Sequence, residues 1–229
     1  MKNIFTYSLI ACLLFLHTAC EENFDELNTN KTSATAIDPV FQLNNAVLSS
    51  SLQSLIYEAG IVQQIISPNS GVLTGANFNQ DNRPATQANW QSIYRNVVKN
   101  TRDVISRAEL LPERPNLLHM ARIVQAYAFM LLTDSYGDVP YTDGGKGYTT
   151  QVFLPVYDSQ EAIYTDIIKE LTEASGALSA ASKVETADIL YNGNIDKWKK
   201  FGYSLLLRAG MRLSKVDPTK AQATVAAAF

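Results

Sequence analysis

Histidine and cysteine are scarce in this chain, which has two of each among its 229 residues. Beyond residue 19, only His119 and Cys20 remain. One Cys and one His are too few for a zinc site built from several such ligands, and Cys20 is the expected lipidation site. Zinc sites of this kind and Cys–His nucleophile pairs are therefore excluded. We expect His119 to be a partly exposed residue on a helix, and we expect neither a metal nor a cofactor.

An excess of basic residues is also missing, because 19 Lys and Arg stand against 22 Asp and Glu, for a net charge of -3. The basic residues are scattered singly, whereas a surface that follows phosphates needs them clustered, so nucleic acid is excluded as a partner. The hydrophobic share of 46% and the mean hydropathy of -0.07 are those of an ordinary globular protein.

Motifs of nucleophilic and phosphate-binding enzymes are absent, since there is neither a Gly-x-Ser-x-Gly elbow nor a P-loop. Paired carboxylates remain possible, and Asp134 and Asp138 are the candidates for a glycosidase. We favour a structural role for both, because they directly follow a long apolar helix that Gly137 can end. Calcium ligation stays open, although the spacing does not match an EF-hand.

The chain opens with a segment typical of an export leader. Lys2 supplies a positive charge, the run from Ile4 to Leu16 is apolar, and the small residues Thr18 and Ala19 precede Cys20. A run of about 13 residues is too short to span a hydrocarbon core, which needs about 20. We predict a signal peptide over residues 1–19.

Cys20 after small residues resembles the lipobox of bacterial lipoproteins, in which the cysteine is acylated and becomes the mature N-terminus. His17 departs from the usual Leu. Cys12 matches the lipobox motif better, but cleavage there would leave a short leader and an exposed apolar run. We therefore favour lipidation at Cys20. An unmodified, buried cysteine in an uncleaved chain is the alternative.

Residues 20–37 are predicted to form an acidic tether behind the lipid anchor. The stretch from Glu21 to Glu26 holds four carboxylates, and the residues after it are mostly polar. Such a patch resembles a surface-export signal of bacterial lipoproteins. A merely solvated linker is the alternative.

From Asp38 onward, apolar residues recur at three- and four-residue spacing, which predicts amphipathic helices and an all-α fold. Asp38 is expected to cap the first helix, and Asp158 with Glu161 to form a capping box on the fourth. The predicted helices cover residues 38–67, 90–111, 115–132, 158–178 and 198–209, and a last one starts at 217.

The connection Pro112–Arg114 is so short that it predicts an antiparallel helical hairpin. Helix pairs of this kind suggest tetratricopeptide-like packing, although no 34-residue period is visible. The third helix is apolar all round near Phe129, so we expect it to be central. The long connections 67–89 and 135–158 are candidates for functional loops.

Several segments together resemble the SusD/RagB family of Bacteroidetes outer-membrane lipoproteins, in its SusD-like branch. The most specific are Leu132-Thr133-Asp134-Ser135-Tyr136-Gly137-Asp138-Val139-Pro140-Tyr141, and Trp198-Lys199-Lys200-Phe201 with Ser204-Leu205-Leu206-Leu207-Arg208-Ala209-Gly210-Met211-Arg212. Others are Cys20–Asn30, Trp90–Tyr94, Pro155–Tyr164 and Asp188–Asn194.

The resemblance implies that residues 38–229 form the N-terminal part of a SusD-like helical domain on the outer face of the outer membrane. It also implies binding of a nutrient, usually an oligosaccharide, and delivery to a SusC-like TonB-dependent transporter. Family members are about twice as long, and the helix after Asp217 runs to Phe229 without a stop signal, so we expect a truncated domain. Arg208 and Arg212 are expected to pair with acids.

We predict that the ligand contacts cluster in the loop from 67 to 89 and at its junction with the next helix. A sugar site needs flat aromatic faces with amide and charged groups around them. That mixture is supplied by Asn77, Phe78, Asn79, Asp81, Arg83 and Trp90. The alternative is a plain polar loop in which Trp90 is a core residue of the helix pair.

Two other classes of function stay open beside nutrient binding. One is an envelope glycosidase that uses Asp134 and Asp138, and the other is a helical scaffold for other envelope proteins. A binder should bind an oligosaccharide without cleaving it, whereas a glycosidase should cleave it.

Overall fold

The computed structural model describes residues 37–50, 59–60, 62, 64 and 83–229. Asp38–Phe229 forms one compact unit. The described residues fold into helices joined by turns, apart from an isolated antiparallel bridge between Val139 and Asp158. The all-α prediction is confirmed.

The helices, in chain order, are α3 (Pro39–Ser49), α5 (Arg83–Ser92), the π-helical segment η3 (Ile93–Val98), α6 (Lys99–Ala108), α7 (Pro115–Tyr136), α8 (Gly147–Thr150), α9 (Gln160–Ala177), α10 (Ile195–Arg212) and α11 (Pro218–Ala227). No helix in the described part of the chain is long and apolar enough to cross a membrane.

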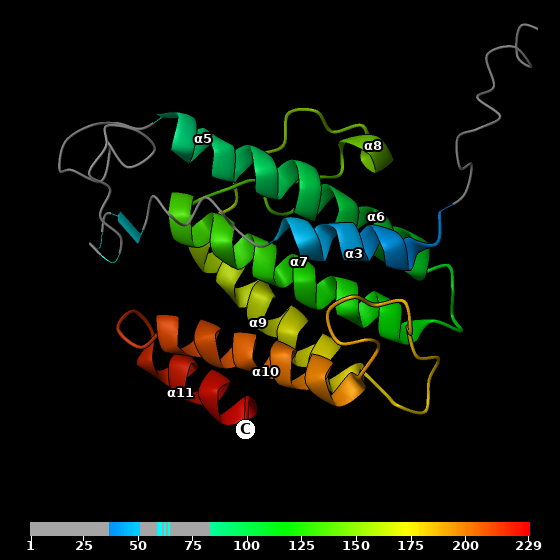
Figure 1. Cartoon of the computed structure of the whole chain (residues 1–229). Coiled ribbons are helices and arrows are strands. Elements are labelled where there is room, and N and C mark those ends of the chain that lie inside the picture. The colour runs from blue at the N-terminus through cyan, green and yellow to red at the C-terminus, as the bar shows by residue number, and fades with distance from the viewer. Residues whose placement is uncertain (1–36, 51–58, 61, 63, 65–82) are drawn as a thin grey trace, which may run out of the picture. The chain divides into compact units, whose positions relative to one another are not determined.

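The five helices α6, α7, α9, α10 and α11 pack as a series in which each lies against the next, in that order (Figure 1). α3 lies across α6 and η3. α7 contacts both α6 and α9, and its fully buried side chains include Leu117, Met120, Phe129 and Leu132. The predicted hairpin and the central position of the third helix are confirmed.

The first predicted helix is shorter than expected, because α3 ends at Ser49. The hydroxyl of Ser50 donates a hydrogen bond to the Val47 carbonyl at 2.7 Å, and serine side chains that bond nearby backbone groups weaken a helix. Val62, which we placed on the same helix, lies in a turn. Most of the stretch between them lies outside the described residues.

The second predicted helix starts earlier than Trp90, at Arg83. Pro84 lies in its first turn, where proline loses no hydrogen bond and its fixed φ suits the helix. Residues 83–89 of the predicted loop are therefore helical, Arg83 among them, while residues 67–82 lie outside the described part of the chain.

The prediction that Asp158 caps α9 in a capping box is wrong. Ser159 is the N-cap, and its hydroxyl accepts a hydrogen bond from Ala162 N. The Asp158 carboxylate instead accepts hydrogen bonds from Tyr141 N, Thr142 N and the Thr142 hydroxyl, at 2.8–2.9 Å. It ties the end of the 137–159 connection to the start of the same connection.

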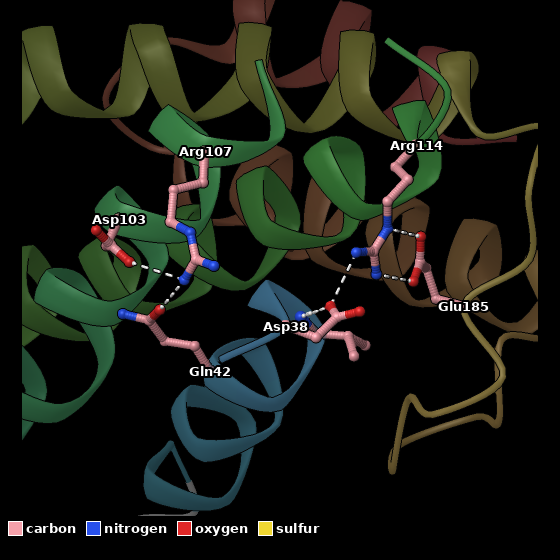
Figure 2. Close-up of polar contacts among 7 residues, drawn as sticks. Asp38, Gln42, Asp103, Arg107, Arg114 and Glu185 are labelled. Carbon is pink, nitrogen blue, oxygen red and sulfur yellow. Dashed lines mark hydrogen bonds and ion pairs between the residues drawn. The ribbon is translucent and has the colours of Figure 1, made fainter. Parts of the chain in front are cut away.

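One guanidinium joins the amino ends of α3 and α7 to the segment between α9 and α10 (Figure 2). Arg114 precedes α7, donates to both carboxylate oxygens of Glu185, and donates to Asp38 at 2.8 Å. Asp38 caps α3 as predicted, through a 2.9 Å hydrogen bond from Val40 N. Partial burial acts to raise the pKa of Asp38, but the bonds from Val40 and Arg114 outweigh it and lower that pKa.

Candidate functional site

Four aromatic rings gather where the carboxyl end of α7 meets α5 and the residues before α9. The Trp90 ring lies 4.8 Å from that of Tyr94 and 5.2 Å from that of Tyr136, measured between centroids. Tyr157 lies over Trp90 at 6.2 Å, with the two planes only 23° apart. We call Trp90, Tyr136 and Tyr157 the aromatic platform.

Hydrogen bonds hold two of these four rings, those of Tyr136 and Tyr94, in place. The Tyr136 hydroxyl donates to the Thr86 carbonyl on α5, and the Tyr94 hydroxyl donates to the Pro140 carbonyl at 2.8 Å. Burial raises the pKa of Tyr94, so its phenol stays protonated and able to donate. Trp90 is half-buried against the core, while Tyr157 is 65% exposed. The platform therefore combines a fixed base with accessible ring surface, as stacking on a sugar requires.

A shallow pocket of about 300 Å³ opens beside the platform. Its lining is Arg83, Thr86, Gln87, Trp90 and Tyr136. The pocket thus offers aromatic faces together with a guanidinium and an amide, which is the mixture that we predicted for a sugar site.

Of the six predicted ligand residues, Arg83 and Trp90 line this one pocket. They are seven residues apart on α5, a spacing that returns to the same face of a helix. The other four, Asn77, Phe78, Asn79 and Asp81, lie outside the described residues. Trp90 also packs on the core, so the two interpretations of this residue are compatible.

The sequence reasoning missed Tyr136 and Tyr157, which the fold brings to Trp90 from other elements. Both lie inside segments that carried the family resemblance. Two tyrosines at the edges of the long 135–158 connection were the available signal, but only their tertiary contacts with Trp90 assign them to the site.

Asp134 and Asp138 both have structural partners. Asp134 accepts a hydrogen bond from the Tyr164 hydroxyl and pairs with Arg212 at 2.8 Å, which confirms the predicted acid partner of Arg212. Asp138 accepts a 2.9 Å hydrogen bond from Gln160 N, at the first turn of α9. Gly137, with a φ of 75°, ends α7 as expected. These contacts favour the structural role of the two acids.

Metal ligation has little support within the described ranges, where no group of three or more His, Cys, Asp or Glu is placed to hold an ion. His119 is half-exposed on α7, as predicted. Its burial and the nearby charge of Arg122 lower the pKa of the imidazole below its usual value, which favours the neutral form.

The sequence over residues 26–229 matches the model of a family described as starch-binding and associating with the outer membrane. The chain belongs to the SusD-like family. The SusD-like fold is equally clear in solved structures. A chitin-binding protein is 33% identical with a TM-score of 0.74, and the match covers 84% of this chain. A SusD-like protein of Bacteroidetes is 30% identical with a TM-score of 0.73, again over 84% of this chain.

A SusD/RagB protein from Bacteroides thetaiotaomicron is 25% identical, with a TM-score of 0.69 over 85% of this chain. The match covers 42%, 36% and 43% of these three solved chains, so this SusD-like chain spans less than half the length of each. No curated protein sequence matches the chain closely enough to count as a relative.

Proposed function

We propose that this SusD-like chain binds an oligosaccharide at the outer face of the outer membrane and passes it to a SusC-like TonB-dependent transporter. The aromatic platform beside the Arg83 pocket carries the proposal. It places ring faces, a guanidinium and an amide around one concavity, and these groups match the apolar face and the hydroxyls of a pyranose.

The comparisons support a glycan as the ligand. The family is described as starch-binding, and one similar solved structure is that of a chitin-binding protein. Oligomers of N-acetylglucosamine and of glucose are therefore the first ligands to test. The four predicted loop residues Asn77, Phe78, Asn79 and Asp81 remain part of the proposed site.

We also propose that a lipid on Cys20 holds the chain on the membrane, after removal of residues 1–19. The match to a family associated with the outer membrane supports this location. The acidic stretch of residues 20–37 would then separate the lipid from the helical domain.

Binding without turnover separates this function from the glycosidase alternative. The full-length protein in detergent is titrated by calorimetry with chitooligosaccharides and maltooligosaccharides, and the sugars are then analysed for shorter products. We expect saturable binding of one series and no cleavage. Cleavage that is abolished by Asp134→Asn would support the glycosidase instead, and the absence of binding to either series would contradict the proposal.

A further inference from the structure

Tyr157 is the ring of the aromatic platform with the least support of its own. It lies over Trp90 at 6.2 Å between centroids, but it is 65% exposed. Within the described part of the chain, no residue from 152 to 157 takes part in a hydrogen bond. The position of the Tyr157 ring therefore depends on what holds the chain directly after it, at Asp158.

Asp158 is bound to the turn after α7 through both its backbone and its side chain. Its N–H and its carbonyl form the antiparallel bridge with Val139, at 3.0 and 3.2 Å. Its carboxylate accepts the N–H groups of Tyr141 and Thr142 and the hydroxyl of Thr142, at 2.8–2.9 Å. Hydrogen bonds to an ionised carboxylate are shorter and stronger than those between neutral groups. We call these contacts the Asp158 clamp.

The turn that the clamp holds is itself bound to the helix that carries Trp90. Tyr94 follows Trp90 by four residues, and the two ring centroids lie 4.8 Å apart. The Tyr94 hydroxyl donates to the Pro140 carbonyl, inside the same turn, at 2.8 Å. The Asp158 clamp therefore fixes the chain beside Tyr157 to the same scaffold that holds Trp90.

Order in the free protein matters for an aromatic binding site. A ring that becomes ordered only when the ligand arrives loses conformational entropy at that moment, and the affinity falls by this amount. Trp90 packs on the core, and Tyr136 is held by the hydrogen bond from its hydroxyl. Tyr157 has neither support, so its order depends on a neighbouring residue.

We propose that Asp158 is a positioning residue of the glycan site, whose carboxylate holds the chain so that the Tyr157 ring lies over Trp90 before the ligand binds. This inference rests on the proposed function. It deepens that function by assigning part of the affinity to a residue that acts through Tyr157 without touching the sugar. Loss of the carboxylate should therefore weaken binding only while the Tyr157 ring is present.

A double-mutant cycle in the full-length protein tests this dependence. Calorimetry measures the affinity for chitohexaose, or for maltohexaose if that series is the one that binds, in wild type, Asp158→Ala, Tyr157→Ala and the double variant. Asp158→Ala should weaken binding roughly two- to tenfold, as expected for one side chain that must be ordered on binding. In the Tyr157→Ala background the same change should have no further effect, because residues that act as a unit are not additive.

Two further variants separate positioning from general loss of stability. Asp158→Asn keeps one acceptor oxygen, so its affinity should lie between those of wild type and Asp158→Ala, and it carries the comparison if Asp158→Ala does not fold. Asp217→Ala is the matched control, since the Asp217 carboxylate also accepts a backbone N–H, that of Lys220 at 2.9 Å, but caps α11 outside the platform. It should lower the melting temperature and leave the affinity unchanged.

Acrylamide quenching of tryptophan fluorescence reports the ring position without ligand. The chain has two tryptophans, and Trp198 is fully buried, so the quenching reports mainly on Trp90. Asp158→Ala should raise the quenching toward the value of Tyr157→Ala, because the ring no longer covers Trp90. Asp217→Ala should keep the wild-type value.

The outcomes distinguish the two claims. Equal losses of affinity on removing the Asp158 carboxylate in the two backgrounds, or unchanged quenching in the folded variants at Asp158, would overturn the positioning role and leave the proposed function intact. Absence of binding of either hexasaccharide to the wild type would contradict the proposed function, and the inference with it.

Discussion

Arg114 and Glu185 form a buried, two-point ion pair, although 71 positions separate them in the chain (Figure 2). Their side chains are only 7% and 3% exposed. The same guanidinium reaches Asp38 at the start of α3. The pair therefore fixes the segment after α9 against the amino end of the central helix.

Arg114→Met should destabilise the protein strongly, because it leaves the Glu185 carboxylate buried without its partner. Loss of one member of a buried pair costs about 3–5 kcal/mol. Urea unfolding followed by circular dichroism measures the change. Asp103→Ala is the control, since Asp103 pairs with Arg107 at 3.7 Å on the surface and such pairs contribute below about 1 kcal/mol. Equal losses of unfolding free energy in the two variants would contradict a larger stabilisation by the buried Arg114 pair.

Gly202→Ala should separate α9 from α10. A Cβ at this position would lie 2.0 Å from the Ser175 hydroxyl and 3.1 Å from Ile123 Cδ1, and overpacking of this kind costs about 1–3 kcal/mol. Gly176→Ala is the matched control on α9, because its Cβ would meet only the Tyr203 hydroxyl at 3.8 Å. The melting temperature should fall for the first variant and hold or rise for the second. A stable Gly202→Ala protein would contradict the close packing of the two helices.

Acid should loosen the connection between α7 and α9. Partial burial acts to raise the pKa of Asp158, but hydrogen bonds from Thr142 N and Tyr141 N outweigh it and lower that pKa below its usual value. Since the folded pKa lies below the unfolded value of about 3.9, the stabilisation is complete above about pH 5 and is lost progressively as the pH falls past the unfolded pKa and through the folded one. The Asp158→Asn variant should therefore have a lower free energy of unfolding than the wild type at pH 7. As the pH falls from 5 to 3, its free energy of unfolding should decrease less than that of the wild type. Glu113→Gln, at an exposed turn, should keep the wild-type profile.

Mass spectrometry of the protein extracted from membranes tests the anchor. We expect a mature chain that begins at Cys20 and carries lipid, because the leader is too short to span a membrane. Cys20→Ser should remain in the cell with its leader attached. An unmodified Cys20 behind an intact leader would refute the anchor, and lipid on Cys12 would move it to the alternative position.

Local pattern was sufficient for much of the fold. Apolar spacing predicted α7, α9 and α10, and Asp38 and Asp217 cap their helices as their sequences indicate. Ser159, and not the predicted Asp158, caps α9, because the Asp158 carboxylate accepts hydrogen bonds from Tyr141 and Thr142. This is a tertiary contact that sequence spacing does not reveal. Arg83 and Trp90 could be proposed from composition, but Tyr136 and Tyr157 join them only through ring contacts with Trp90 across elements that are distant in the sequence.

Glycan binding on the aromatic platform is the central claim, and calorimetry on platform variants tests it most directly. Loss of an aromatic anchor typically costs about 2 kcal/mol or more, so Trp90→Ala and Tyr157→Ala should each weaken oligosaccharide binding at least tenfold. Tyr157 is 65% exposed, so its variant should keep the wild-type melting temperature. Tyr148→Ala, which removes a tyrosine that is 98% exposed outside the platform, should bind as the wild type does. Unchanged affinity in folded Trp90→Ala and Tyr157→Ala proteins would contradict the account.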